Sequence, residues 1–261
     1  MTSSAKQDHQ APQPARDAAT VVIVRDRDDA PAELLMVRRS GRMRFAGGAM
    51  VFPGGAVDEA DRDFAASLVH DLTVEEAAMR IAAIRESVEE VGVAIGLPDI
   101  SHADISDVRA MLHAGWSLEQ ALHGSGVTPA LDALTPFARW RPNHPEVRVF
   151  DTRFYLSAIA PDAPEPTADA TENEALCWIS AADMLARADR GEAQIIFPTR
   201  RNLERLAQFP DYQSLRRHAL SIPVRTITPW IEERDGRPHL CIDQDMGYPT
   251  CAEPLENVRR G

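Results

Sequence analysis

Three glutamates and an arginine stand close together in the segment 83–92, which reads AIRESVEEVG. If this segment is helical, Glu86, Glu89 and Glu90 fall within an arc of about 100°. Carboxylates gathered on one arc repel each other, and hard divalent cations prefer oxygen ligands. The spacing therefore indicates a site for a divalent cation. A Glu-rich face is more often simply solvated, so the three acids alone do not decide between these interpretations.

The residues around the glutamates have helical periodicity. Apolar residues recur at alternating gaps of three and four between Thr73 and Val91, mainly opposite the glutamates. Thr73 is suited to cap the N-terminus of a helix, and Gly92 follows the last apolar position. The pattern predicts an amphipathic helix over 73–91 that presents the three carboxylates to solvent or to a cleft.

Length and composition favour one large domain. The chain has 261 residues, of which 44% are hydrophobic, and this is enough to bury a sizeable core. Residues 1–19 are rich in Pro, Ala and polar residues and lack an apolar run, so we expect a disordered leader. We expect a single domain over 20–261, with a helical and hairpin extension from about residue 198.

Charge and cysteine content exclude several classes of protein. The net charge of −12 and a pI near 5.1 oppose binding to nucleic acid. The cysteines form no C-x-x-C pair, so neither a zinc site nor a disulfide framework is indicated. No window approaches the roughly 18 apolar residues of a membrane span. We expect a cytoplasmic protein with no nucleic-acid or membrane partner, and a homodimer is left open.

The rest of the chain reads as a mixture of strands and helices, without an internal repeat. Strands early, one long helix, strands again and helices late predict an α/β fold in which helices sandwich a mixed sheet. The arginines between 200 and 217 are expected on a solvated helix face. The expected strands are 20–26, 33–39, 49–52, 147–160 and 175–180; the other expected helices lie within 101–123, 181–189 and 199–208, and a hairpin surrounds 232–240.

The segment 85–93 resembles the end of the signature motif of the Nudix hydrolases. That motif ends in Arg-Glu, an apolar residue, any residue, Glu-Glu, any residue, Gly and an apolar residue, and only Ser87 departs from it. Gly55, in the run FPGG, supplies the glycine that opens the motif. The resemblance implies a Nudix-type α/β/α sandwich and hydrolysis of a diphosphate with Mg²⁺ or Mn²⁺ as cofactor.

The resemblance also implies roles for the motif residues. Arg85 is expected to brace the carboxylates rather than touch the substrate. The general base is less defined, and Glu172 and Glu174 are the candidates. The favoured alternative is that each of them is only an exposed carboxylate in a loop. The expected catalytic residues are Arg85, Glu86, Glu89 and Glu90, and the expected metal ligands are the three glutamates and the carbonyl of Gly55.

The motif is longer here than the family pattern. The segment between Gly55 and Arg85, residues 56–84, holds about 16 residues more than usual, so an insertion precedes the glutamate-bearing half of the helix. The first glutamate of the family motif therefore has no unique equivalent. Counting forward from the glycine gives Asp61, and counting backward from the arginine gives Ala77, with Glu75 and Glu76 nearby, so the position is left unassigned.

A second signature upstream resembles the Nudix branch that acts on coenzyme A, although Met36 and Val37 replace a leucine and a threonine of that pattern. With the lengthened motif and the run 150–161, the likeness is to the peroxisomal coenzyme A diphosphatases of animals, over most of 20–210. The matching positions are Leu35, Arg39, Ser40, Arg44, Gly48 and the run Phe52, Pro53, Gly54 and Gly55.

The upstream signature also has a physical rationale. Four arginines on one Gly-rich segment of an acidic protein suit a ligand with a diphosphate and a further phosphate. Of Arg38, Arg39, Arg42 and Arg44, we favour phosphate binding for Arg39 and Arg44; the alternative is pairing with surface acids. The residues expected to bind substrate are Arg39, Ser40, Arg44, Gly48 and Gly54.

Three functions are open at this point. The favoured one is hydrolysis of coenzyme A or acyl-coenzyme A to adenosine 3′,5′-bisphosphate and 4′-phosphopantetheine or its acyl form. Met36 and Val37 keep open a Nudix hydrolase of another nucleoside diphosphate derivative, such as ADP-ribose or NADH. A catalytically silent nucleotide-binding module is disfavoured, because silent versions usually lose motif carboxylates and none is lost here.

Overall fold

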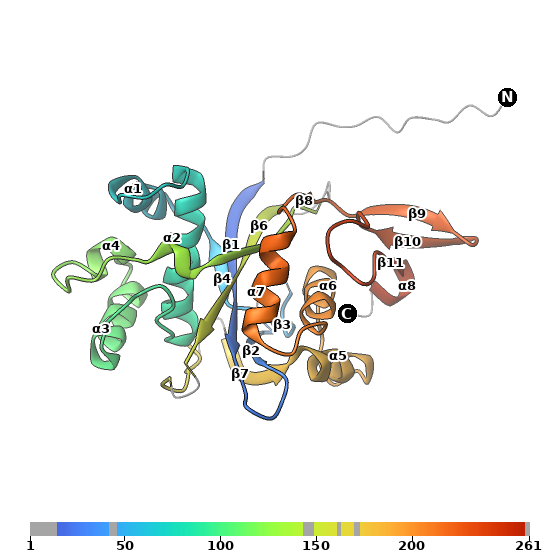
Figure 1. Ribbon diagram of the computed structural model, residues 1–261, viewed down its shortest axis with the longest axis horizontal. Helices are drawn as coiled ribbons and strands as arrows, with labels where there is room; N and C mark the ends of the chain where they lie inside the picture. Colours follow the sequence, from blue (N-terminus) through green and yellow to red (C-terminus); the bar gives the residue numbers. More distant parts are fainter. Residues whose placement is uncertain (1–14, 42–45, 143–148, 161–162, 170–172, 259–261) are drawn as a thin grey trace.

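The computed structural model describes residues 15–41, 46–142, 149–160, 163–169 and 173–258. In them, a mixed eight-stranded sheet is covered by helices on both faces (Figure 1), which confirms the expected α/β sandwich. Its strands are β1 (Arg16–Arg25), β2 (Glu33–Arg39), β3 (Met50–Val51), β4 (Gly54–Ala56), β5 (Thr135–Trp140), β6 (Phe150–Ile159), β7 (Asn173–Ser180) and β8 (Thr226–Ile227).

Strand β1 lies at the centre because its residues alternate between two apolar cores. Val21 and Ile23 belong to the core on one face, and Val22 and Val24 belong to the core on the other. The strand pairs in parallel with β6 and antiparallel with β2 and β4. One face carries α1 (Glu59–Ser67), α2 (Val74–Val91), α3 (His102–His113), α4 (Leu118–Ala121) and the 3₁₀ turn Leu131–Ala133; the other carries α5 (Ala181–Asp189), α6 (Phe197–Leu206) and α7 (Tyr212–Ser221).

Strand β1 begins at Arg16, before the expected start at Thr20. The expected leader, 1–19, therefore extends too far into the chain. Ala18 and Ala19 are buried and pair with β4, which packs close to them because it is made of glycine and alanine. Small residues give no apolar run, so this part of the strand has no signal in the sequence.

Three further elements differ from expectation. Helix α1 lies in the insertion of the motif, and neither β5 nor α7 is predicted by the apolar pattern. Of the arginines between 200 and 217, Arg201 and Arg205 are 2% exposed, so the predicted solvated face is wrong for them. Their guanidinium groups lie over the aromatic rings of Phe197, Phe137 and Tyr248, which allows burial of the charge.

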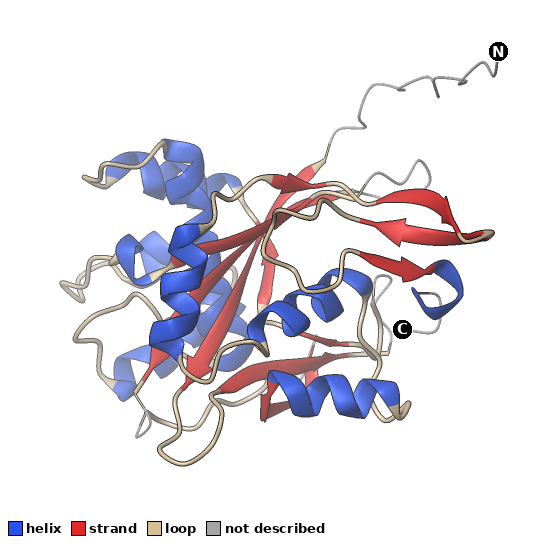
Figure 2. Cartoon of the chain, turned by 45° about the vertical axis from the view of Figure 1, so that its right-hand side comes forward, coloured by secondary structure: helices blue, strands red, loops and turns tan. Residues whose placement is uncertain are grey.

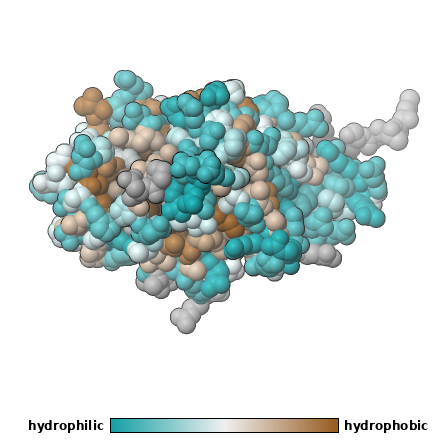
Figure 3. Space-filling model, turned by 60° about the horizontal axis from the view of Figure 1, so that its bottom comes forward, coloured by the Kyte–Doolittle hydropathy of each residue, from teal (hydrophilic) through white to brown (hydrophobic). Residues whose placement is uncertain are grey.

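The C-terminal segment forms a small separate sheet (Figure 2), which contains the expected hairpin. Asp235 and Gly236 both have positive φ, as a tight two-residue hairpin turn requires. On the face shown in Figure 3, apolar residues form several separated patches rather than one broad surface. Among the described helices, none combines the length and apolar character needed to cross a bilayer. The elements are β9 (Trp230–Arg234), β10 (Arg237–Cys241), β11 (Ala252–Pro254) and α8 (Leu255–Val258).

Candidate active site

The candidate site lies where the C-terminal half of α2 meets the ends of β2, β4 and β7. Helix α2 has the expected bounds because its ends are capped: the Thr73 hydroxyl accepts from the Glu76 N–H at 3.2 Å, and Gly92 adopts φ 66° just beyond the helix. The capped helix carries the sequence-predicted Glu86, Glu89 and Glu90 on its last two turns.

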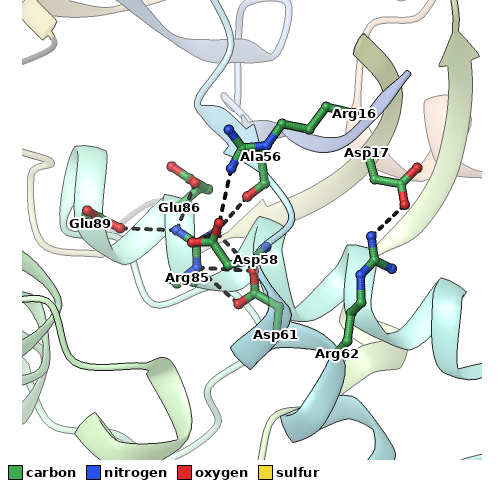
Figure 4. Close-up of polar contacts among 9 residues, drawn as sticks. All are labelled: Arg16, Asp17, Ala56, Asp58, Asp61, Arg62, Arg85, Glu86 and Glu89. Carbon is green, nitrogen blue, oxygen red and sulfur yellow. Dashed lines mark hydrogen bonds and ion pairs between the residues drawn. The ribbon is translucent and has the colours of Figure 1, made fainter. Parts of the chain in front are cut away.

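Arg85 is the centre of a buried network of acids (Figure 4). Its Nη1 donates to Glu86 Oε1 at 2.8 Å and lies 3.2 Å from Glu89 Oε2. Its Nε and Nη2 bind the two carboxylate oxygens of Asp61, each at 3.0 Å, and Nη2 also donates to the Ala56 carbonyl at 2.8 Å. The guanidinium therefore contacts the backbone at the end of β4 and two of the three predicted carboxylates.

Asp61, one of the two positions reached by counting along the motif, contacts Arg85. It is 2% exposed in the first turn of α1, where its side chain also accepts from the Asp58 N–H at 2.9 Å. Ala77, the alternative, is buried in the apolar core. The acid that contacts Arg85 is thus the one reached by counting forward from Gly55, and α1 lies between Gly55 and the helix that carries the glutamates.

Glu90 is held on the other side of the site. Its Oε2 accepts from the Gly54 N–H at 2.9 Å. Asn173, 1% exposed at the start of β7, also faces this carboxylate and favours its charged form, as does Arg39. The sequence analysis misses Asn173, because no motif marks this residue. Only the pairing of β7 with β2 in the fold places it opposite Arg39.

Burial and mutual repulsion disturb the titration of these acids. Burial raises the pKa of Glu90 to about 8, and the charge of Glu86 adds to the rise. Burial also raises the pKa of Glu86 to about 7; Arg85 opposes this rise and Glu89 adds to it. For Arg85, burial alone would lower the pKa, but Glu86, Asp61 and Asp58 outweigh it and raise the pKa above its ordinary value. The buried carboxyls of Glu86 and Glu90 thus repel each other, and a bound cation would relieve this repulsion.

The expected metal ligands are not gathered into one set. Within the described ranges, no group of three or more His, Cys, Asp or Glu side chains is arranged to hold a metal ion. Arg85 engages Glu86 and Glu89, and the Gly54 N–H engages Glu90. The donor set nevertheless fits a divalent cation, because Glu86 and Glu90 are buried oxygen donors that repel each other. Glu89 is 32% exposed and can leave its 3.2 Å contact with Arg85.

The two glycines of β4 shape this site in different ways. A Cβ on Gly55 would lie 2.3 Å from Glu86 Oε1, whereas a Cβ on Gly54 would lie 2.4 Å from the carbonyl oxygen of Ala19. The neighbour of Gly55 is the flexible end of a side chain, while the neighbour of Gly54 is the backbone of the central strand. The backbone of Gly55 therefore lies directly against a predicted metal ligand.

Gly55→Ala is expected to fold but to lose about 100-fold in kcat/KM, because Glu86 must turn away from the added methyl. Gly54→Ala is expected to lose about 1–3 kcal/mol of stability, because the β1 backbone cannot give way. Urea denaturation and a divalent-metal-dependent diphosphatase assay measure the two effects. Wild-type kcat/KM in Gly55→Ala would contradict the role of this close contact.

The residues expected to bind substrate lie at the same edge. Arg39 ends β2 close enough to Glu90 to favour its charge, and its Nε is buried with no hydrogen-bond partner among the described residues. Ser40 follows it and is buried. The Gly48 N–H donates to the Arg39 carbonyl at 3.0 Å. Arg44 lies outside the described residues. Arg39 thus has an unused buried donor, and its charge lies close enough to act on Glu90.

The two candidates for the general base fare differently. The Glu174 carboxylate accepts from the Gly41 N–H at 3.3 Å and lies 3.6 Å from Arg38. Glu174 is exposed, as in the alternative, but it lies in β7 rather than in a loop. Glu172 lies outside the described residues, so its role stays a prediction.

Two hollows of about 470 Å³ each lie elsewhere on the molecule. One is lined by Arg139, Arg153 and residues of α7, and the other by the loop after α2 and the end of β6. None of Glu86, Glu89 and Glu90 lines either hollow. The acids therefore lie outside both hollows.

The chain is similar to known proteins in sequence and in fold. The NUDIX domain profile matches residues 14–109. The fold is similar to the crystal structure of a NUDIX hydrolase from Alicyclobacillus acidocaldarius, with 30% sequence identity and a TM-score of 0.67, over 79% of this chain and 97% of that one. The sequence is also 27% identical to "Putative nudix hydrolase 7" of Caenorhabditis elegans over 222 residues, 81% of this chain and 69% of that protein.

Proposed function

The chain belongs to the Nudix hydrolases, which cleave diphosphate bonds in nucleoside diphosphate derivatives, and on this premise we propose that its substrate is coenzyme A or acyl-coenzyme A. Cleavage of the diphosphate would give adenosine 3′,5′-bisphosphate and 4′-phosphopantetheine or its acyl form. We also propose a cytoplasmic location, which follows from the sequence alone, and Mg²⁺ or Mn²⁺ as the cofactor.

One observation carries the proposal. Arg39, a matching position of the coenzyme A signature, lies beside Glu90 with a buried Nε that has no partner among the described residues. A buried guanidinium N–H without a partner is costly, so a ligand oxygen is a natural acceptor for it. This geometry supports a phosphate group bound between Arg39 and the acids of α2.

The residues of the chain divide the work of hydrolysis. A divalent ion, when bound, neutralises the charge of the diphosphate and acidifies a water. Glu86, Glu89 and Glu90 would hold it, with the backbone of Gly55 beside Glu86. Arg85 would hold α2 against the end of β4 and the start of α1, through the Ala56 carbonyl and Asp61. Arg39 would orient the diphosphate, so that positioning and electrostatics supply most of the rate enhancement.

The proposal is tested by mass spectrometry of products after incubation with Mn²⁺ or Mg²⁺. The panel contains coenzyme A, an acyl-coenzyme A, dephospho-coenzyme A, ADP-ribose and NADH. We expect adenosine 3′,5′-bisphosphate from coenzyme A, with slower cleavage of dephospho-coenzyme A if arginines bind the 3′-phosphate. Preferred cleavage of ADP-ribose or NADH would replace this substrate by the alternative, and no turnover of any diphosphate would favour the silent module.

The raised pKa values of Glu86 and Glu90 predict that metal affinity depends on pH. Below those values the folded protein holds protons on both carboxyls, and a cation must displace them. The apparent Kd for Mn²⁺ is therefore expected to fall by at least about tenfold between pH 6 and pH 8. Electron paramagnetic resonance of free Mn²⁺ measures the Kd, and an unchanged Kd over this range would contradict the prediction.

A further inference from the structure

Arg109 of α3 binds the end of the helix that carries the glutamates. Its Nε donates to the Glu89 carbonyl and its Nη2 to the Glu90 carbonyl, each at 3.0 Å. These carbonyls belong to the last turn of α2, where a helix leaves its acceptors without internal partners. A Cβ on Gly92 would lie 3.1 Å from Arg109 Nη1, so the guanidinium lies close against the helix end.

The same guanidinium binds the segment 163–169. Its Nη1 donates to the Thr167 hydroxyl at 2.6 Å, and its Nη2 donates to the Thr167 carbonyl at 2.8 Å. The Thr167 N–H in turn donates to the Val91 carbonyl at 3.0 Å. Arg109 and Thr167 together therefore satisfy three carbonyls of the last turn of α2, those of Glu89, Glu90 and Val91.

A second chain of contacts returns from this segment to the site. Asp169 Oδ1 accepts from the Asn173 N–H at 3.0 Å, and Asn173 faces Glu90. Burial lowers the pKa of Arg109, and the nearby charge of Asp169 opposes that shift. Arg109 thus touches the backbone of two predicted metal ligands directly and reaches the neighbour of one of them through the segment 163–169.

We propose that Arg109 is a positioning residue for diphosphate hydrolysis, which clamps the end of α2 to the segment 163–169 and so sets the places of Glu89, Glu90 and Asn173. The inference rests on the proposed metal-dependent function. It adds a residue that lies beyond the signature motif, on a different helix. The guanidinium acts through its planar fork, which binds the helix end with Nε and Nη2 and the segment with Nη1 and Nη2.

The test compares Arg109→Ala and Arg109→Lys with Arg80→Ala. Arg80 is a matched control, because it is buried in the N-terminal half of α2 and donates to Glu76 Oε1 and to the Leu131 carbonyl. For Arg109→Ala we expect Mn²⁺ affinity and kcat each to fall about 10–100-fold, with KM for coenzyme A changed less than about threefold. Arg109→Lys keeps the charge but not the fork, so an intermediate loss is expected.

Three measurements distinguish positioning from loss of stability. Mn²⁺ affinity is measured by electron paramagnetic resonance without substrate, hydrogen exchange of the Thr167 N–H is measured in the metal-free protein, and unfolding is followed in urea. Arg80→Ala should lose stability and keep its Mn²⁺ affinity. Added guanidinium at millimolar concentration should restore part of the kcat of Arg109→Ala.

Unchanged Mn²⁺ affinity in Arg109→Ala would overturn the inference, as would an equal loss in Arg80→Ala. If coenzyme A is not the substrate, the result differs from a failure of the inference on Arg109. In that case the wild-type protein leaves coenzyme A uncleaved, while the Mn²⁺ affinities and the exchange of Thr167 still report on the clamp.

Discussion

Glu90→Gln is expected to lower kcat/KM by about 10³-fold, or about 4 kcal/mol of transition-state stabilisation. The substitution keeps the size of the side chain and an oxygen that can accept from the Gly54 N–H, so the local geometry should survive. It removes the negative charge that would hold a divalent cation next to Glu86. The loss should lie mainly in kcat at saturating substrate, because the cation acts most strongly on charge that develops in the transition state.

The same variant should be no less stable than the wild-type protein in the absence of metal. Because burial raises the pKa of Glu90 to about 8, its contribution to stability is present below the ordinary carboxyl pKa and is lost as the pH rises to about 8. Glutamine resembles the protonated acid and carries no charge to desolvate. The stability of Glu90→Gln, measured in urea, should therefore depend less on pH than that of the wild type.

Glu75→Gln is the matched control for Glu90→Gln. Glu75 is an exposed glutamate in the first turn of the same helix. We expect wild-type kcat/KM and an unchanged pH profile of stability. Near wild-type activity in Glu90→Gln, or equal losses in both variants, would show that the carboxylate of Glu90 does not serve the chemistry.

Helix α2 could be predicted from the sequence because a long periodic pattern and two capping residues all indicate the same element. Strand β5 could not, because Pro136 and Arg139 interrupt its apolar pattern. Its burial depends on β6 and α7, which are distant in sequence. Arg205 is buried for a similar reason, since Phe137 and Tyr248 meet only in the fold.

In the candidate site too, the local sequence pattern predicts some features, and only the fold determines the others. Residue types and helical spacing indicate that Glu86, Glu89 and Glu90 lie near one another, and they do share one end of α2. The spacing cannot show which partner each carboxylate takes. Arg85 lies one residue before Glu86 and four before Glu89, so its guanidinium can reach both acids from the same helix. The contacts of Asp61 and Asn173 come from other elements, and only the fold brings them to the helix.

The second large effect is expected for Arg85→Ala, which should lose about 3–5 kcal/mol of stability, because it leaves buried acids without their cation. Asp61 is 2% exposed and would lose all of its hydrogen bonds from the guanidinium, and Glu86 would lose one. The free energy of unfolding in urea, measured at pH 7 without divalent metal, gives the magnitude.

Arg62→Ala is the control for Arg85→Ala, since Arg62 pairs with Asp17 at 2.6 Å but both side chains are about one third exposed (Figure 4). That pair should be worth no more than about 1 kcal/mol. The double variant Arg85→Ala with Asp61→Ala should recover part of the loss, because it removes the buried carboxylate that has no partner. If Arg85→Ala costs no more than Arg62→Ala, then Arg85 does not hold the acids, and the glutamates depend on some other support.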